Sequence, residues 1–448
     1  MIKKTTLFVL LGAILLGAAV YFFDWRRSQK ESEKPSADAE KLAFSIQPQD
    51  VTSLVLSRPA NPAEPGLRIE KRNGAWQIIQ PIDTQADQSA LEGIVDGLAG
   101  ARISQTEPGT PDRLKVYGLD PPGVSLEFQL HNGSKHTLLM GNKDFTQTLA
   151  YSIVDGAKSV DLLPESLLIS LSKSLQDLRD RGVLHVVSGQ VVSFSLKNSS
   201  GQLEARKEKN GWEFANPKDA LADETSVNSL LSSLASAKMS AVSSETPDNL
   251  ANYGLASPAI SFTATDEKGI ISTLMVGKKD GSEYFARDAS RPMIFRISED
   301  LYKKLSENYS DLRDKKVVHY DSADITHIEI HNANGILAAT RKSESEWIVD
   351  DPPDVKGKSA DLSRVFSALD QARAGEIFDH RAPGVAAKLA KPAVEITLTA
   401  KDGRKLSAEI SKESDGFVYA RTSDGPAIYK LDKQILEDLN FKPSEITF

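Results

Sequence analysis

An internal threefold repeat constrains this chain more than any other feature of its sequence. From about Phe44 onward, a unit of about 135 residues occurs three times. Three of the four tryptophans mark equivalent positions, 136 and 135 residues apart, at Trp76, Trp212 and Trp347. The line "YGLDPPGVSLEF" from Tyr117 returns as "YGLASPAISFTA" from Tyr253 and, more weakly, as "AKLAKPAVEITL" from Ala387. A unit of this length can form its own hydrophobic core, so it is a domain rather than a solenoid repeat.

The repeat sets the predicted domain boundaries. A chain of 448 residues is too long for one hydrophobic core, and its length alone suggests about three domains. No Gly/Ser-rich linker separates the copies, so we expect them to be docked rather than loosely strung. The predicted segments are a membrane anchor, a polar tether and three repeat domains, at residues 1–25, 26–43, 44–184, 185–319 and 320–448.

The spacing of apolar residues predicts the elements of one copy. Alternation predicts strands at residues 51–58, 66–72 and 75–79. Helical spacing predicts an amphipathic helix over residues 89–100 and a single final helix over 164–180, which opens with Pro164. Equivalent hairpin turns are expected at Asn132-Gly133, Lys268-Gly269 and Asp402-Gly403. This mixture of helices and tight hairpins favours an α+β fold with mostly antiparallel sheets.

The stretch "DLRDRGVLH" from Asp177 resembles a small active site, because it combines carboxylates, guanidiniums and an imidazole. It recurs 134 residues later as "DLRDKKVVH" from Asp311, directly before the first strand of the next copy. We expect Asp177 and Asp180 to share a helix face, and a neighbouring arginine to pair with them or to cap carbonyls. The recurrence favours a structural role at the inter-repeat junction for Asp177, Arg179, Asp180, His185, Asp311, Arg313, Asp314 and His319.

The N-terminus predicts a membrane anchor. Residues 7–23, "LFVLLGAILLGAAVYFF", are uncharged and would rise roughly 26 Å as a helix. The alternative is a cleaved signal peptide, with Gly17 and Ala19 before the cut. The short tail before the run favours a cytoplasmic N-terminus, a single pass through a bacterial inner membrane and a periplasmic location for the bulk of the chain. The Lys and Arg count on the two flanks favours the reverse orientation.

No familiar catalytic signature occurs in the sequence, and we predict no catalytic residue, no cofactor and no metal site. The acidic loop of the third copy, with Asp350, Asp351 and Asp354, is interpreted as solvated, with a Ca²⁺ site as the alternative. The absence of cysteine excludes disulfides and thiolate ligands. A formal net charge of -8 without a basic stripe argues against a nucleic-acid partner. The repeated tryptophans are expected in the three cores.

Several lines of the sequence together resemble a known bacterial family. A single membrane-spanning segment, copies of a domain of this length, and the lines "YGLDPPGVSLEF", "LLMGNK", "YFARD" and "DLRDRGVLHV" are similar to the family called domain of unknown function 4340. The resemblance spans residues 44–448, and it implies no catalytic residues. Members are often encoded beside ABC-type transporters, including gliding-motility-type permeases and auxiliary proteins. The third copy departs from the pattern, because it lacks "YGL" and has "ISKE" in place of "MGNK".

These observations lead to one expected function and one alternative. We expect a non-enzymatic, membrane-anchored extracytoplasmic scaffold or auxiliary subunit, whose partner is an ABC permease or an auxiliary protein. The alternative is a periplasmic binding module for a lipid, a glycan or a peptide. An enzyme would need a titratable cluster in one copy that the other copies lack, and only the loop near Asp350 approaches this condition.

Overall fold

The structure is a computed structural model, and it describes residues 41–209, 211–217, 220–379 and 383–448. The predicted anchor, residues 7–23, and most of the predicted tether lie outside the described residues. The chain divides into two compact units: unit 1 comprises residues 1–182 with 238–241, and unit 2 comprises residues 183–237 with 242–448. Three large sheets account for most of the strands, and every strand pairing in the described part of the chain is antiparallel.

Unit 1 contains one nine-stranded sheet, in the order β5-β4-β3-β2-β8-β9-β10-β11-β7. The strands are β2 (Val51–Ser57), β3 (Leu67–Arg72), β4 (Ala75–Gln80), β5 (Thr84–Gln85), β7 (Gln105–Pro108), β8 (Val124–Leu130), β9 (Lys135–Lys143), β10 (Leu149–Val154) and β11 (Ser159–Pro164). A small second sheet pairs β1 (Lys41–Leu42) with β6 (Arg102–Ile103). The helices are η1 (Pro48–Asp50), α2 (Gln88–Gly100), α3 (Pro111–Val116), α4 (Glu165–Leu171) and α5 (Leu175–Leu178).

Unit 2 contains two further sheets. The first has eight strands in the order β14-β13-β12-β16-β17-β18-β19-β15. These are β12 (Val191–Asn198), β13 (Gly201–Glu208), β14 (Gly211–Asn216), β15 (Val242–Ser244), β16 (Ile260–Asp266), β17 (Ile271–Asp280), β18 (Glu283–Asp288) and β19 (Ile294–Ile297). Its helices are η2 (Ser188–Gln190), α6 (Glu224–Ser236), η3 (Leu250–Tyr253), α7 (Glu299–Leu305) and α8 (Tyr309–Leu312).

The last sheet has nine strands in the order β23-β22-β21-β20-β25-β26-β27-β28-β24. These are β20 (Ile325–Asn332), β21 (Gly335–Arg341), β22 (Trp347–Asp351), β23 (Ser359–Ala360), β24 (Glu376–Phe378), β25 (Val394–Ala400), β26 (Lys405–Ile410), β27 (Phe417–Thr422) and β28 (Ile428–Asp432). Its helices are η4 (Ser322–Asp324), α9 (Ser363–Gln371), α10 (Pro383–Ala386), η5 (Ala387–Leu389), α11 (Gln434–Leu439) and η6 (Pro443–Glu445).

The three sheets share one strand order. The only difference is at one edge of the eight-stranded sheet, where a single bridge between Glu213 and Leu221 stands where the other two sheets have a two-residue strand. The fold class is therefore α+β with mostly antiparallel sheets, as the sequence predicts. The predicted hairpin turns form as well, because Gly133, Gly269 and Gly403 have φ of 86°, 79° and 82°, a region that glycine enters without strain.

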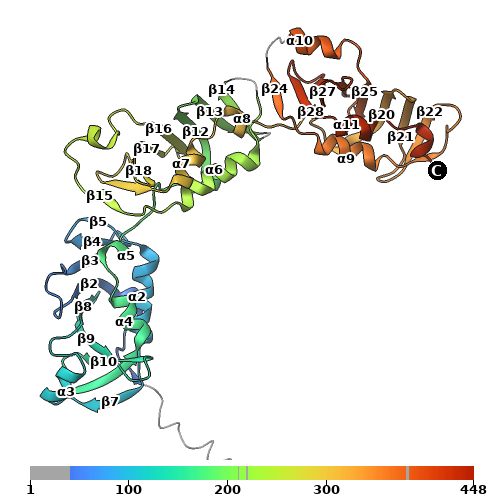
Figure 1. The fold of residues 1–448 in the computed structure, drawn as a ribbon. Helices are drawn as coiled ribbons and strands as arrows, with labels where there is room; N and C mark the ends of the chain where they lie inside the picture. Colours follow the sequence, from blue (N-terminus) through green and yellow to red (C-terminus); the bar gives the residue numbers. More distant parts are fainter. Residues whose placement is uncertain (1–40, 210, 218–219, 380–382) are drawn as a thin grey trace, which may run out of the picture. The chain divides into compact units, whose positions relative to one another are not determined.

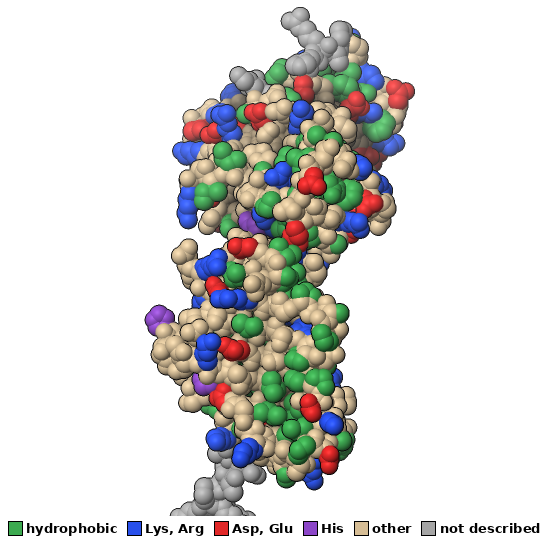
Figure 2. All heavy atoms as spheres, turned by 90° about the vertical axis from the view of Figure 1, so that its left-hand side faces the viewer, with side chains coloured by type: hydrophobic (Ala, Val, Ile, Leu, Met, Phe, Trp, Pro, Cys, Tyr) green, Lys and Arg blue, Asp and Glu red, His purple; other side chains and the backbone are tan. Residues whose placement is uncertain are grey.

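The core of unit 1 lies between its sheet and two helices. Figure 1 shows α2 and α4 on one face of this sheet. α2 buries Leu91, Ile94, Val95 and Leu98 against it, because these side chains recur at helical spacing. Alternate residues of the strands point to the opposite face, which no helix covers in Figure 1. Hydrophobic side chains gather over unit 1 in Figure 2, where this unit is the lower part of the molecule.

The single final helix predicted over residues 164–180 is wrong. The chain forms two short helices there, α4 and α5, and Pro164 is the N-cap of α4 rather than its first residue. A new helix begins at Leu175 because Ser174 and Asp177 form a capping box. The Asp177 carboxylate accepts hydrogen bonds from the Ser174 amide over 3.0 Å and from the Ser174 hydroxyl over 2.6 Å, so it satisfies a backbone donor that a continuous helix would have used internally.

Candidate binding cleft in the first repeat

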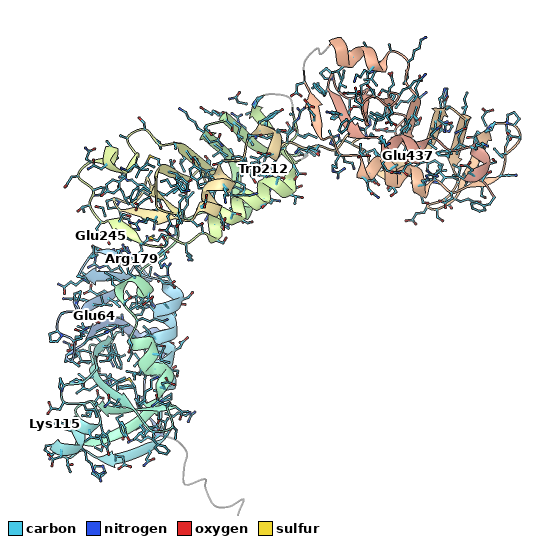
Figure 3. All side chains as sticks on the ribbon, viewed as in Figure 1. Glu64, Lys115, Arg179, Trp212, Glu245 and Glu437 are labelled. Atoms are coloured by element: carbon cyan, nitrogen blue, oxygen red, sulfur yellow. The ribbon has the colours of Figure 1, made fainter. Side chains whose placement is uncertain are left out.

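A cleft of about 800 Å³ lies at one end of unit 1. It is lined by α3, by β7, by the loop that joins β9 to β10, and by the strands β10 and β11. Figure 3 places Lys115 of α3 and Arg179 of the recurring motif at opposite ends of this unit. The cleft is therefore separate from the motif around Arg179, although Tyr117 of the repeated line "YGLDPPGVSLEF" lines it.

Two stacked tyrosines form part of the cleft wall. The rings of Tyr117, which follows α3, and Tyr151, on β10, lie 3.9 Å apart at an interplanar angle of 14°. Burial raises the pKa of the Tyr151 hydroxyl, and the neighbouring Tyr117, Asp144 and Glu107 raise it further. The hydroxyl therefore stays protonated at neutral pH, and the pair offers an uncharged aromatic surface.

A close approach of two backbone segments fixes the position of Tyr117. The amide of Asn142 donates a hydrogen bond to the carbonyl oxygen of Tyr117 over 2.7 Å, and the Asn142 side chain donates to the carbonyl oxygen of Val116 over 3.0 Å. A Cβ atom on Gly141 would lie 2.2 Å from the Tyr117 oxygen, which no real contact allows. Glycine is therefore required here by space, and the same holds for Gly277 in the second repeat, where the distance is 2.1 Å.

The loop between β9 and β10 is held by one carboxylate. Asp144 is only 4% exposed, and it accepts hydrogen bonds from the hydroxyl of Thr146 over 2.6 Å and from the amides of Thr148 and Leu149 over 3.2 and 3.0 Å. The bond from the Thr146 hydroxyl helps to hold the pKa of Asp144 below its usual range. The loop is therefore well ordered by its own hydrogen bonds.

This ordered loop carries an apolar side chain into solvent. Phe145 is 94% exposed, and Val116, at the end of α3, is 72% exposed. Both residues line the cleft together with the tyrosine pair. Large apolar side chains at the mouth of a cleft are typical of binding sites, because exposing them gives up the favourable free energy of burial.

Charged residues give the cleft an excess of acid. Its lining contains Glu107, Asp112, Asp144 and a single cation, Arg113. A nitrogen of Arg113 lies 3.2 Å from a carboxylate oxygen of Glu107, so this pair is already neutralised. The remaining charge of the lining is negative.

The equivalent places in the other repeats are built differently. In the second repeat the loop is two residues shorter, and Gly281 stands where the first repeat has Phe145, counting from the shared glycine. Tyr253 meets Phe285 edge to face at 5.1 Å. In the third repeat Tyr419 lies 8% exposed beneath the ammonium group of Lys388, 4.4 Å from its ring centroid.

Sequence reasoning missed this cleft. The available signal was the loop length, because "GNKDFTQTLAY" is two residues longer than "GKKDGSEYF". The third repeat also replaces the shared glycine with Ser411, whose hydroxyl accepts a hydrogen bond from the Tyr419 amide over 2.9 Å. That repeat lacks the "YGL" segment, so nothing there requires the space that glycine leaves.

The recurring motif closes each repeat onto its own sheet. In the first repeat, Asp177 is part of the capping box, and Arg179 forms a bridge with Ala86 beside β5. Arg179 is fully buried. Asp177 and Asp180 do not share a helix face, contrary to the prediction, because α5 ends at Leu178 and the chain is extended from Arg179.

The second copy of the motif repeats this backbone pattern with other side-chain partners. Asn308 and Asp311 form the capping box, and Arg313 forms a bridge with Ala222. The guanidinium of Arg313 binds both carboxylate oxygens of Asp379, at 2.7 and 2.5 Å.

The remaining residues of the two copies differ in their contacts. His319 lies 2.8 Å from a carboxylate oxygen of Asp314, whereas His185 lies 4.0 Å from Asp288. The side chains of Asp180 and Asp314 have the same backbone role, since each accepts a hydrogen bond from the amide two residues later.

In the third repeat the residues before Phe448 take the same place. Thr447 forms a bridge with Ala360, where the first two repeats have an arginine. The amide of Asp361 donates to the carbonyl oxygen of Ile446, just as that of Asp87 donates to Leu178. The backbone arrangement is thus independent of the arginine.

The tryptophans and the acidic loop show no site geometry. Trp76, Trp212 and Trp347 are 2%, 2% and 5% exposed and lie in the three cores. In the acidic loop of the third repeat, Asp350 accepts a hydrogen bond from the hydroxyl of Thr340 over 2.6 Å. Among the described residues, no group of three or more His, Cys, Asp or Glu side chains could hold a metal ion.

The shared strand order defines a tandem-repeat α+β protein, and the cleft with the exposed Phe145 belongs to its first repeat. The model of the family described as domain of unknown function (DUF4340) matches residues 76–213 and 212–387. The chain belongs to this family, and the resemblance noted in the sequence is confirmed over residues 76–387. No curated protein and no solved structure matches the chain.

Proposed function

We propose that this protein is a non-enzymatic, membrane-anchored extracytoplasmic scaffold or auxiliary subunit that holds a partner protein in the cleft of its first repeat. The observation that carries the proposal is the display of Phe145. Burying a phenylalanine side chain is worth about 1.5–3 kcal/mol, yet Phe145 is 94% exposed on a loop that Asp144 orders. A partner that covers this side chain recovers that free energy, which supports a docking role.

Two parts of the proposal, the membrane anchor and the link to a transport system, are based on the sequence. Residues 7–23 are apolar enough to span a bilayer, and the similarity to proteins encoded beside ABC-type transporters suggests a permease or an auxiliary protein as the partner. Within the part of the chain that the structure describes, no helix is long and apolar enough to cross a membrane. The proposed location is a bacterial inner membrane, with the repeats in the periplasm.

Co-purification tests this proposal. The full chain is solubilised in mild detergent from cells that express either the natural chain or a Phe145→Asp variant. Ile271→Asp is the matched control, because Ile271 is 68% exposed on β17 of unit 2. A permease or an ATPase should accompany the natural chain and the control, and it should be lost from the Phe145→Asp variant. Recovery of the natural chain as a lone monomer would reject the scaffold function.

The stacked tyrosines support a second candidate function, a periplasmic module for a small ligand. An uncharged aromatic surface beside polar side chains is typical of sites that stack on glycan rings or apolar groups. Native mass spectrometry of residues 44–448 distinguishes the two functions. A bound lipid, glycan or peptide that disappears in a Tyr117→Ala variant would favour the binding module, and a mass without any addition would reject it.

A further inference from the structure

We infer that the cleft of the first repeat binds a segment of a membrane-embedded partner protein in which an apolar side chain is flanked by Lys or Arg. This inference rests on the proposed function and names the chemistry of the partner. Three observations carry it: the place where the chain enters unit 1, the apolar lining of the cleft, and the sign of its charge.

The chain enters unit 1 beside the cleft. Lys41 pairs with Ile103, which lies two residues before β7, and β7 lines the cleft. Seventeen residues, 24–40, separate this point from the apolar run at 7–23. Whatever its conformation, a chain of 17 residues reaches at most roughly 60 Å. With the proposed anchor in a bilayer, the entry point beside the cleft therefore stays within roughly 60 Å of the membrane surface, where the extramembrane segments of a membrane protein also lie.

The apolar part of the site is already arranged for binding. Phe145 and Val116 project into solvent at the cleft, and the Tyr117–Tyr151 pair lies in the same lining. The loop that carries Phe145 is fixed by the hydrogen bonds of Asp144, so little conformational entropy is lost when a partner covers it. One large apolar side chain of the partner fits this surface.

The negative charge of the cleft lining determines which residues beside the partner's apolar side chain would strengthen binding. Arg113 neutralises Glu107, which leaves the carboxylates of Asp112 and Asp144 as the net charge of the cleft. Opposite charge on the partner strengthens binding and speeds association, whereas an acidic segment is repelled. A segment with Lys or Arg next to its apolar residue is therefore the complementary one.

The same charge argues against two other occupants. The six residues before Lys41, "PSADAE", carry Asp38 and Glu40 and have no large apolar side chain, so they do not complement the cleft. An anionic bilayer surface attracts Lys and Arg and repels carboxylates, so an acidic cleft is poorly suited to it. A basic, apolar protein segment remains the best match.

Peptide binding to the full chain in uncharged detergent micelles tests the inference. The probes are three labelled synthetic dodecapeptides: one alternates Leu and Lys, one alternates Leu and Glu, and one alternates Ser and Lys. Fluorescence anisotropy should show the Leu/Lys peptide binding about tenfold or more tightly than either of the others. Equal binding of the Leu/Lys and Leu/Glu peptides would overturn the inference.

Two substitutions locate the binding. Phe145→Ser should weaken the Leu/Lys peptide about tenfold or more, because it removes the apolar contact. Asp112→Lys should reduce the preference for Lys over Glu peptides about tenfold. Asp300→Lys is the matched control, since Asp300 of α7 is, like Asp112 of α3, an exposed acidic residue in the first turn of a helix. If Asp300→Lys reduced the preference for Lys over Glu peptides as much as Asp112→Lys does, the peptides would be binding through the overall charge of the chain. That result would contradict the inference.

A fluorescent dye at position 145 distinguishes a protein segment from a lipid bilayer as the occupant of the cleft. The chain contains no cysteine, so Phe145→Cys provides a unique attachment point for an environment-sensitive fluorophore. In lipid nanodiscs, we expect its emission to shift only when the Leu/Lys peptide is added. A shift in anionic nanodiscs without peptide would mean that the bilayer occupies the cleft, and would overturn the inference. If the partner still co-purifies while the peptides show no preference, the scaffold function stands and this inference alone fails.

Discussion

Replacing Gly141 by alanine tests whether the cleft wall depends on the close approach of two backbone segments. A Cβ atom at this position would lie 2.2 Å from the carbonyl oxygen of Tyr117 and 2.7 Å from that of Gly118. Both obstacles are backbone atoms, so no side chain can rotate away, and β9 must move from the Tyr117 segment. Overpacking of this kind costs about 1–3 kcal/mol, and we expect about 2 kcal/mol for Gly141→Ala.

Hydrogen exchange measures this loss in the full chain without requiring two-state unfolding of all repeats. A loss of about 2 kcal/mol should accelerate exchange of protected amides in β9 and β10 roughly thirtyfold, while amides of unit 2 keep their rates. Gly277→Ala should do the same for β17, because its Cβ would lie 2.1 Å from the Tyr253 oxygen.

The same substitution at Gly93 is the matched control. Gly93 lies inside α2, and a Cβ atom added there would have no neighbour within 4 Å outside the helix itself, so alanine adds no collision. Alanine also favours the helix, so Gly93→Ala should stabilise unit 1 by about 0.5–1 kcal/mol. Slower or unchanged exchange in Gly141→Ala would refute the steric reasoning, whatever the control shows.

Two further predictions concern the recurring motif. Asp177→Ala removes the capping box with Ser174 and should cost about 1 kcal/mol in urea unfolding at neutral pH. The hydrogen bonds of Ser174 lower the pKa of Asp177, so this contribution is present above the ordinary aspartate pKa and disappears as the pH falls through the lowered value; the variant and the natural chain should therefore converge in strong acid. Arg313→Ala should destabilise unit 2 by about 1–3 kcal/mol, because it leaves Asp379 without its bidentate partner. A double-mutant cycle with Asp379→Ala checks this, and strictly additive losses would show that the two residues do not interact.

Much of the fold could be predicted from the sequence because the same unit occurs three times in the chain. Strands such as Val51–Ser57 and the helix Gln88–Gly100 have clear apolar periodicity, and the turn glycines recur at the same place in each copy. The division of the final helix was missed for a physical reason. The Asp177 carboxylate satisfies the Ser174 amide, and this competition with helical hydrogen bonds leaves the apolar spacing unchanged.

The cleft was missed because repetition was used as the guide. Comparison of copies identifies what they share, and it directed attention to the motif from Asp177 and to the tryptophans. The loop with Asp144 and Phe145 differs among the copies, so the comparison discounted it. Its significance depends on facts that no pattern contains: the burial of the Asp144 carboxylate, the exposure of Phe145, and the proximity of α3 to β10.

The last residues of each repeat, which bridge back to its sheet, affect the order in which the repeats fold during synthesis. Arg179, Arg313 and Thr447 each bridge back to the sheet of their own copy, next to Ala86, Ala222 and Ala360. The partner strand of each bridge has therefore been made before its closing residues emerge. Each copy can form its bridge as soon as its own closing residues have left the ribosome, in the order one, two, three. A newly made chain can thus form its closing bridges one copy at a time, which shortens the period in which the sheet edge beside each bridge is open to a strand of a neighbouring copy.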